Sequence, residues 1–124
     1  MAYPARETAL HICERQDGRC VIVEIQGELD MNAVPRLRAE LDHAIEESQP
    51  PCLVLDLTGT SFCDSLGLGL LVSTYNRVRE MGGRLALAVT PGMMISRLLT
   101  ITNLDHHFET HPTTADAVAM VQAA

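Results

Sequence analysis

The stretch DLTGTSFCDSLGLGLL, residues 56–71, decides the fold of this chain. It starts at the end of an apolar run, residues 52–57, that predicts a buried strand, and it passes through a polar loop into a long helix with apolar residues at helical spacing. Loop and helix meet at Asp64-Ser65-Leu66-Gly67. Ser65 is therefore expected in the first helical turn, where unpaired N–H groups and the positive end of the helix dipole face outward. A serine there can act as a nucleophile, bind an anion or accept a phosphate group.

The rest of the sequence predicts one α/β domain over residues 1–124, with residues 1–7 flexible. Strands are expected at residues 8–13, 20–25, 52–57 and 84–89, with a short edge strand around Phe108. Helices are expected after the capping residue Asn32 with Pro35 in the first turn, over residues 66–81 before Gly82, after Thr90-Pro91, and after a capping box at Thr113 and Asp116. The order ββαβαβαβα predicts a mixed, mainly parallel sheet of four to five strands, in which an antiparallel hairpin precedes right-handed crossovers.

Three loops of this order are expected at the same edge of the sheet. Asp30 lies on an exposed loop after the second strand, Ser65 follows the third, and Thr90-Pro91-Gly92 follow the fourth. The carboxyl ends of parallel strands meet at one edge, where binding sites tend to form. We therefore expect an acidic loop, the serine and a proline turn to share one face.

Composition favours a cytoplasmic protein without nucleic acid or membrane as a partner. No apolar run approaches the ~20 residues that cross a bilayer, and the first residues carry no signal-peptide pattern. The net charge of −7 disfavours phosphate backbones. Cys13, Cys20, Cys52 and Cys63 form no C-x-x-C pair, so all four are expected to be free thiols.

Simpler and competing roles exist for the serine. An Asp or Ser before a helix commonly serves only as its cap. Asp64-Ser65-Leu66 also looks like part of the Gly-Asp-Ser-Leu motif of serine esterases, but Cys63 replaces the glycine. That chemistry also needs a histidine base, and no Asp-x-x-His occurs in the chain. A hydrolase is therefore a remote alternative.

No cofactor or metal site is expected. Gly67 and Gly69 mimic a dinucleotide-binding motif but lack its third glycine, so we expect them to permit close packing of helix on sheet. His106, His107 and His111 lack the spacing of a metal-binding helix and are interpreted as a surface cluster.

Four segments together resemble the STAS domain. They are Gly27-Glu28-Leu29-Asp30, residues 53–57, residues 62–69 with the sequence FCDSLGLG, and Gly82-Gly83 before a strand. More narrowly, the chain is similar to stand-alone bacterial anti-sigma factor antagonists, from about Ile12 to the last helix. The resemblance implies a small sheet with helices packed chiefly on one side.

The resemblance also implies a function. In the family, the serine that matches Ser65 is phosphorylated by an anti-sigma factor that is also a serine kinase. The unphosphorylated protein binds that anti-sigma factor and frees a sigma factor, the phosphorylated form does not bind, and a phosphatase resets the switch. The partner-binding residues would be Asp30, Asp64, Ser65, Leu66 and Gly67. Leu66 departs from many relatives, which have Ser, Thr or Ala there, so kinase preference could differ.

Within the same fold, the alternative is a STAS subunit of another signalling or transport complex. No catalytic residue is assigned, and whether the chain forms a homodimer stays open.

Overall fold

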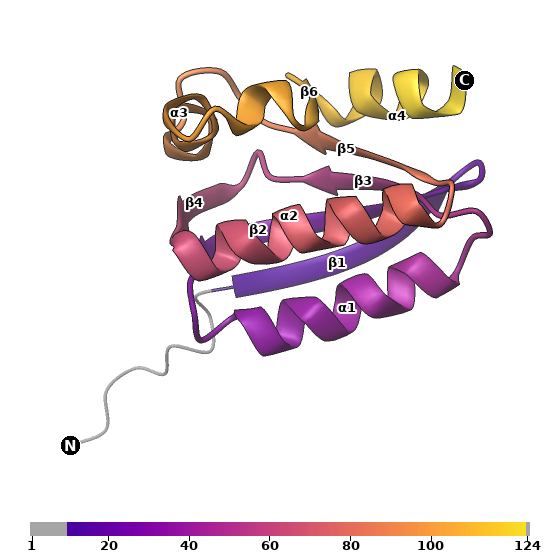
Figure 1. Cartoon of the computed structure of the whole chain (residues 1–124), viewed down its shortest axis with the longest axis horizontal. Helices are drawn as coiled ribbons and strands as arrows, with labels where there is room; N and C mark the ends of the chain where they lie inside the picture. Colours follow the sequence, from indigo (N-terminus) through magenta and orange to yellow (C-terminus); the bar gives the residue numbers. More distant parts are fainter. Residues whose placement is uncertain (1–9, 124) are drawn as a thin grey trace.

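The computed structural model describes residues 10–123, so the predicted flexible segment, residues 1–7, lies outside them. Figure 1 shows a sheet with helices packed against it. The elements are β1 (Leu10–Asp17), β2 (Cys20–Leu29), α1 (Val34–Glu46), β3 (Cys52–Asp56), β4 (Thr60–Cys63), α2 (Ser65–Glu80), β5 (Arg84–Ala88), α3 (Met94–Ile101), the short 3-10 helix η2 (Leu104–His106), β6 (Glu109–His111) and α4 (Thr114–Ala123).

The sheet is mixed and mainly parallel, as predicted. Its order is β1-β2-β3-β5-β6, with β4 paired to β2 off this path. β1 and β2 form the expected antiparallel hairpin, and every other pair is parallel. Within residues 10–123 the sheet has six strands, more than the predicted four to five, because β4 adds a strand where a polar loop was expected.

β4 could not be seen in the sequence because its burial does not alternate. Thr60 and Cys63 are buried, whereas the two residues between them are exposed. The strand pairs with the end of β2 beyond a register shift at Gly27, whose φ of 108° suits only glycine. The Thr60 hydroxyl donates to the carbonyl oxygen of Ile25 at 2.8 Å, which anchors the new strand. β4 therefore leads directly into α2, which begins two residues after it, at Ser65.

Two apolar layers sit on the two faces of the sheet. The larger layer joins the strands to α1, α2 and α3, and the smaller layer lies under α4. Leu53 and Leu55 of β3 face the larger layer, and Val54 faces the smaller one, which confirms β3 as a central strand covered on both faces. The predicted placement of helices chiefly on one side is also confirmed. Within residues 10–123, no helix has both the length and the apolar character needed to cross a bilayer.

Cys20 and Cys52 form a disulfide, so the prediction of four free thiols is wrong. The parallel register pairs Val21 with Leu53, and it therefore brings the preceding residues of β2 and β3 together with Cα atoms 4.7 Å apart. A separation of 32 residues gives no hint of this contact, which exists only in the folded sheet. Cys13 is a free thiol, as predicted.

α1 begins one residue later than a cap at Asn32 predicts. The helix starts at Val34, and Asn32 does not cap it. Instead, Oδ1 of Asp30 accepts hydrogen bonds from the backbone N–H groups of Asn32 and Ala33, at 3.0 and 3.1 Å. The Asp30 side chain thus closes the turn before the helix, and the chain becomes helical only from Val34. Pro35 lies in the first turn, as predicted.

Of the two C-terminal helices, α3 starts later than predicted and α4 has the predicted cap. α3 begins at Met94 and not directly after Thr90, because the N–H of Met93 donates to the carbonyl oxygen of Thr90 at 3.2 Å and closes a turn first. For α4, the Thr113 hydroxyl accepts from the N–H of Asp116 at 3.1 Å, which confirms the predicted cap.

The packing predicts a large difference between two leucines. Leu55 is 0% exposed and Leu66 is 56% exposed. We expect Leu55→Ala to lower the free energy of unfolding by ~2–5 kcal/mol, because it leaves a cavity in the central strand. The matched variant Leu66→Ala should change it by less than ~0.5 kcal/mol. Urea unfolding followed by circular dichroism measures both, and equal losses would contradict this assignment of the core.

Candidate functional site

The carboxylate of Asp64 joins two loops from distant parts of the chain. Its Oδ1 accepts from the N–H of Gly67 at 2.9 Å and caps α2. Its Oδ2 accepts from the N–H of Met31 at 2.9 Å, in the loop between β2 and α1. The N–H of Asp64 itself donates to the carbonyl oxygen of Leu29 at 3.2 Å. The start of α2 and the end of β2 are therefore held together as one unit, by hydrogen bonds that the negative charge strengthens.

Gly67 lets α2 approach the end of β2 closely. A Cβ atom at this position would lie 2.6 Å from the carbonyl oxygen of Leu29 and 3.3 Å from Sγ of Cys63. At Gly69 a Cβ would meet nothing within 4 Å. The predicted packing role is therefore confirmed for Gly67 and wrong for Gly69.

Ser65 and Leu66 stand between these two fixed points, in the first turn of α2 as predicted. Both side chains are exposed. The first amides of an α-helix have no acceptor within the helix, so the N–H groups of Ser65 and Leu66 are free for a ligand. The positive end of the helix dipole lies at the same place. The arrangement offers a reachable hydroxyl in a positive local field.

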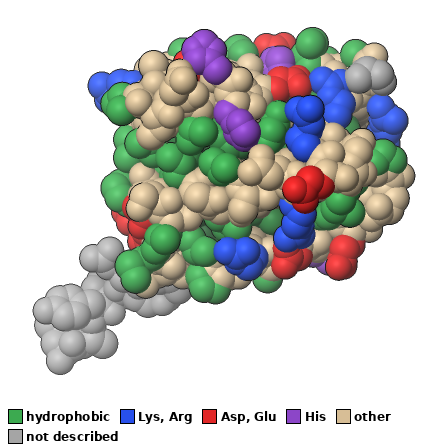
Figure 2. All heavy atoms as spheres, in the orientation of Figure 1, with side chains coloured by type: hydrophobic (Ala, Val, Ile, Leu, Met, Phe, Trp, Pro, Cys, Tyr) green, Lys and Arg blue, Asp and Glu red, His purple; other side chains and the backbone are tan. Residues whose placement is uncertain are grey.

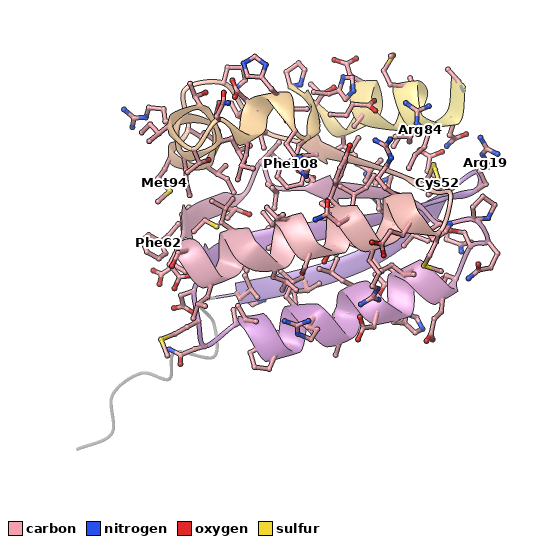
Figure 3. All side chains as sticks on the ribbon, in the orientation of Figure 1. Arg19, Cys52, Phe62, Arg84, Met94 and Phe108 are labelled. Carbon is pink, nitrogen blue, oxygen red and sulfur yellow. A yellow bond between two sulfur atoms is a disulfide. The ribbon has the colours of Figure 1, made fainter. Side chains whose placement is uncertain are left out.

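Three exposed apolar side chains come from the segments that meet at the start of α2, and we call them the apolar patch: Met31, Phe62 and Leu66. They are 61%, 41% and 56% exposed, respectively. Figure 3 shows Phe62 of β4 and Met94 of α3 at the same end of the molecule. In Figure 2, hydrophobic side chains gather on the side of the molecule where α2 begins. Exposed apolar side chains that gather on one side of a protein tend to mark an interaction site.

The three loops expected at one edge do lie there. Figure 1 shows the loop after β2, the start of α2 and α3 at the same end of the sheet, and α3 packs against β4. Asp30 is half-buried, although an exposed loop was expected. Its carboxylate turns into its own loop to hold the amides before α1, so it shapes the backbone that carries Met31.

Nothing in the described part of the chain activates Ser65 as a nucleophile. Burial and then the charge of Asp64 raise the pKa of the Cys63 thiol to about 12, so this neighbour stays a neutral thiol at pH 7. No hydrogen bond joins Ser65 to a histidine within residues 10–123. The polar partners of the histidines there are carboxylates: Glu14 and Glu47 for His43, Asp105 for His106, and Glu109 for His111.

Of the three histidines interpreted as a surface cluster, His106 and His107 are exposed and His111 is half-buried. The ring of His107 lies against that of Tyr75, with centroids 4.8 Å apart and a tilt of 56° between the ring planes. His111 instead places Nε2 3.0 Å from Oε2 of Glu109. Across residues 10–123, one group of three side chains with converging metal-ligand atoms exists, and it contains none of these histidines.

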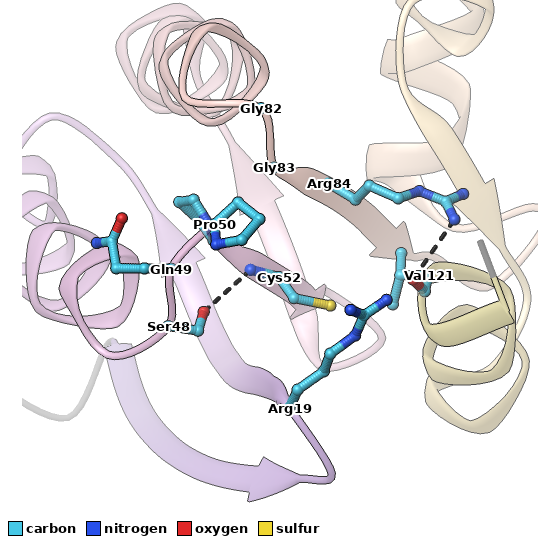
Figure 4. A pocket seen from close by; sticks show the side chains of 10 residues that line it. Arg19, Ser48, Gln49, Pro50, Cys52, Gly82, Gly83, Arg84 and Val121 are labelled. Atoms are coloured by element: carbon cyan, nitrogen blue, oxygen red, sulfur yellow. Dashed lines mark hydrogen bonds between the residues drawn. The ribbon is translucent and has the colours of Figure 1, made fainter.

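A hollow of about 380 Å³ lies near the opposite end of the sheet. Figure 4 shows Arg19, Pro50, Cys52 and Arg84 around it. The Arg84 guanidinium is already occupied, because it donates to Glu109 at 3.0 Å and to the last carbonyl groups of α4. The loop before β3 and the turn before β5 line most of this hollow, and Val121 of α4 closes one side, so we interpret it as a packing gap between these segments.

Comparison with known proteins identifies the family of this chain. Residues 12–117 match the STAS domain family. The chain belongs to the STAS domain family. An anti-sigma F factor antagonist of Paenibacillus polymyxa is 35% identical over 85 residues, which cover 68% of this chain and 71% of that protein. An anti-sigma-B factor antagonist of Bacillus subtilis (strain 168) is 34% identical over 95 residues, covering 77% and 84%.

A solved STAS relative agrees with the fold. The crystal structure of an anti-sigma factor antagonist from Mycobacterium paratuberculosis superposes with a TM-score of 0.82 at 27% identity. The match covers 94% of this chain and 97% of that one. The arrangement of strands and helices is thus a shared STAS architecture.

The two glycines of α2 give a matched test of the site's geometry. We expect Gly67→Ala to lower the free energy of unfolding by ~1–3 kcal/mol, because the new methyl group would meet the Leu29 carbonyl and push α2 away from β2. Gly69→Ala should raise it by ~0.5–1 kcal/mol, since open space surrounds the position and alanine favours a helix. Denaturant unfolding of both variants measures the difference. A Gly67→Ala chain as stable as the Gly69→Ala chain would contradict the close approach.

Proposed function

We propose that this STAS protein is an anti-sigma factor antagonist controlled by phosphorylation of Ser65. In this proposal the unphosphorylated chain binds an anti-sigma factor that is also a serine kinase, and a sigma factor is released. Phosphorylation of Ser65 prevents that binding, and a phosphatase restores it. The anti-sigma factor antagonists to which the chain is similar support this class of partner. The observation that carries the proposal is an exposed serine at the start of α2, where the segments that carry the exposed apolar patch meet.

The surface around Ser65 suits a protein partner. Met31, Phe62 and Leu66 offer apolar area that a partner can remove from water, at roughly 25 cal/mol per Å². Asp64 and Asp30 contribute by holding the backbone beneath this area, through four hydrogen bonds to main-chain amides. Gly67 is buried, and it contributes by setting the helix against β2. A surface fixed in advance loses less entropy when it docks.

The same placement explains how phosphate would switch binding off. A phosphoserine adds about −1.5 to −2 charges at neutral pH. In the free protein, the unpaired amides and the dipole of α2 would stabilise that charge. In a complex, the apolar patch would enclose it against a partner surface shaped for a neutral hydroxyl. An uncompensated buried charge costs about 3–5 kcal/mol, which corresponds to a hundredfold or more in affinity.

This mechanism requires no rearrangement of the fold. Ser65 is exposed before modification, so a phosphate has room without displacing a neighbour. Both oxygens of Asp64 are already engaged, and the loops they hold have no need to move. We therefore propose local electrostatic exclusion of the partner.

The proposal assigns no catalytic residue to this chain. A hydrolytic serine needs a base within hydrogen-bond reach, and the described residues supply none to Ser65. We propose a cytoplasmic protein that acts through its protein partners, in keeping with the net charge of −7, which disfavours nucleic acid.

The first test locates the phosphate. The full chain and a Ser65→Ala variant are incubated with ATP and an anti-sigma factor kinase of the source organism, and the products are mapped by mass spectrometry. We expect a single phosphate on Ser65 in the wild type and none in Ser65→Ala. Phosphate on another residue, or unmodified wild type with a kinase that binds it, would contradict the proposal.

The second test isolates the effect of charge on binding. Ser65→Asp should weaken binding to the anti-sigma factor at least tenfold in calorimetry, because it places a permanent charge within the apolar patch. Ser73→Asp is a matched control with the same change on an exposed position of α2, about 12 Å further along the helix. It should bind like the wild type. Wild-type affinity for Ser65→Asp, or equal losses in both variants, would refute the charge mechanism.

A further inference from the structure

A second cluster of functional side chains lies away from Ser65, between the edge strand β1 and α1. Glu14 comes from β1, His43 comes from α1, and Glu47 is the residue that ends α1 as its C-cap. One ligand atom from each of these three residues can be chosen so that all lie within 4.8 Å of one another. We propose that Glu14, His43 and Glu47 form a binding site for a divalent transition-metal ion, with Zn²⁺ as the best fit.

Glu14 occupies a position where the fold calls for an apolar residue. Along β1, Leu10 and Ile12 alternate onto the helix-covered face and pack into the main core. Glu14 is next in this row, and its partner across the hairpin is Val23, which is itself a core residue. A half-buried carboxylate there breaks the local pattern, and such breaks tend to mark functional positions.

The helix supplies the other ligands at a suitable spacing. His43 and Glu47 are four residues apart, which places them on neighbouring turns of the same helical face. Nδ1 of His43 lies 3.3 Å from Oε2 of Glu14 and 3.0 Å from Oε1 of Glu47. Tetrahedral zinc with bonds of about 2.0–2.1 Å holds its ligand atoms about 3.3 Å apart. The distances from His43 already suit zinc, so only the oxygens of Glu14 and Glu47 need to move closer to each other, by a small side-chain rotation.

The surrounding groups favour a cation. The carboxylates of Glu14 and Glu47 converge on the single imidazole of His43, and like charges held this close repel one another unless a cation lies between them. Arg15 pairs with Glu24, and the ion pairs of Glu14 and Glu47 within residues 10–123 are with His43 alone.

Two further polar side chains, Arg36 and Gln16, lie near the proposed ligands. Arg36, one turn before Glu40, donates to the carbonyl oxygen of Leu10, at the other end of β1. Gln16 donates to Oε2 of Glu47 at 3.2 Å and would hold that carboxylate in position. Glu40 or water would fill the fourth coordination position.

The donor set selects among metals. One imidazole nitrogen with carboxylate oxygens suits Zn²⁺ and its neighbours in the first transition row, whereas Ca²⁺ and Mg²⁺ prefer oxygen ligands alone. A bound ion would join the edge strand to α1 and add its binding energy to the stability of the native state. The site therefore predicts zinc-dependent stability that is independent of Ser65.

Zinc chloride titrated into the metal-free full chain tests the proposal by calorimetry and thermal unfolding. The parent carries Cys13→Ser, because the exposed Cys13 thiol could bind zinc itself. We expect one zinc ion per chain, a higher Tm with zinc, and no comparable rise with magnesium chloride. Glu14→Gln, His43→Gln and Glu47→Gln should each weaken zinc binding by about tenfold or more.

Two control variants keep this test specific. His106→Gln removes another exposed histidine, and Glu46→Gln removes an exposed carboxylate beside the cluster. Both should bind zinc like the parent. The proposal is overturned if the parent shows no saturable zinc binding, if His43→Gln binds as tightly as the parent, or if His106→Gln loses as much affinity as His43→Gln.

Discussion

The two hydrogen bonds accepted by the carboxylate of Asp64 are the constraint on which the functional surface depends. One oxygen caps α2 through Gly67 and the other holds the loop after β2 through Met31, so a single side chain joins segments 33 residues apart. Gly67 makes this possible because its missing Cβ leaves room for the Leu29 carbonyl. In the pattern Asp-Ser-x-Gly, the aspartate therefore acts as a clamp, by which we mean its hydrogen bonds to Gly67 and Met31, and the glycine permits the close contact with Leu29. The residues between them, Ser65 and Leu66, are free to face a partner.

This arrangement separates stability from recognition. The clamp and the core beneath it fix the backbone, while the side chains of the apolar patch contribute little to folding because they remain exposed. A phosphate on Ser65 would therefore change the charge of the surface without disturbing its support. A partner-controlled switch benefits from such a separation, since both forms stay folded and only docking differs. The metal-binding cluster proposed between β1 and α1 acts on a different part of the fold and concerns its stability.

Local patterns in the sequence were sufficient for most elements and for the position of Ser65. Strand and helix periodicity, the cap at Thr113 and the parallel order each depend on neighbours in the chain, and the structure agrees with them. Contacts between distant segments were beyond this reasoning. The disulfide of Cys20 with Cys52 depends on sheet register, and β4 depends on the bend of β2 at Gly27. The Asp64 to Met31 hydrogen bond is of the same kind, because a cap is visible in the sequence but its second partner is not.

Amide hydrogen exchange in an Asp64→Asn variant tests the clamp most directly. An asparagine has one acceptor oxygen, so it can still cap α2 at Gly67 but cannot also accept from the N–H of Met31. The account predicts that the Met31 amide exchanges roughly tenfold faster or more in the variant, since a hydrogen bond to a charged group is lost, while the Gly67 amide changes much less. A Met31 amide that exchanges at its wild-type rate would contradict the claim that this carboxylate holds the two loops together.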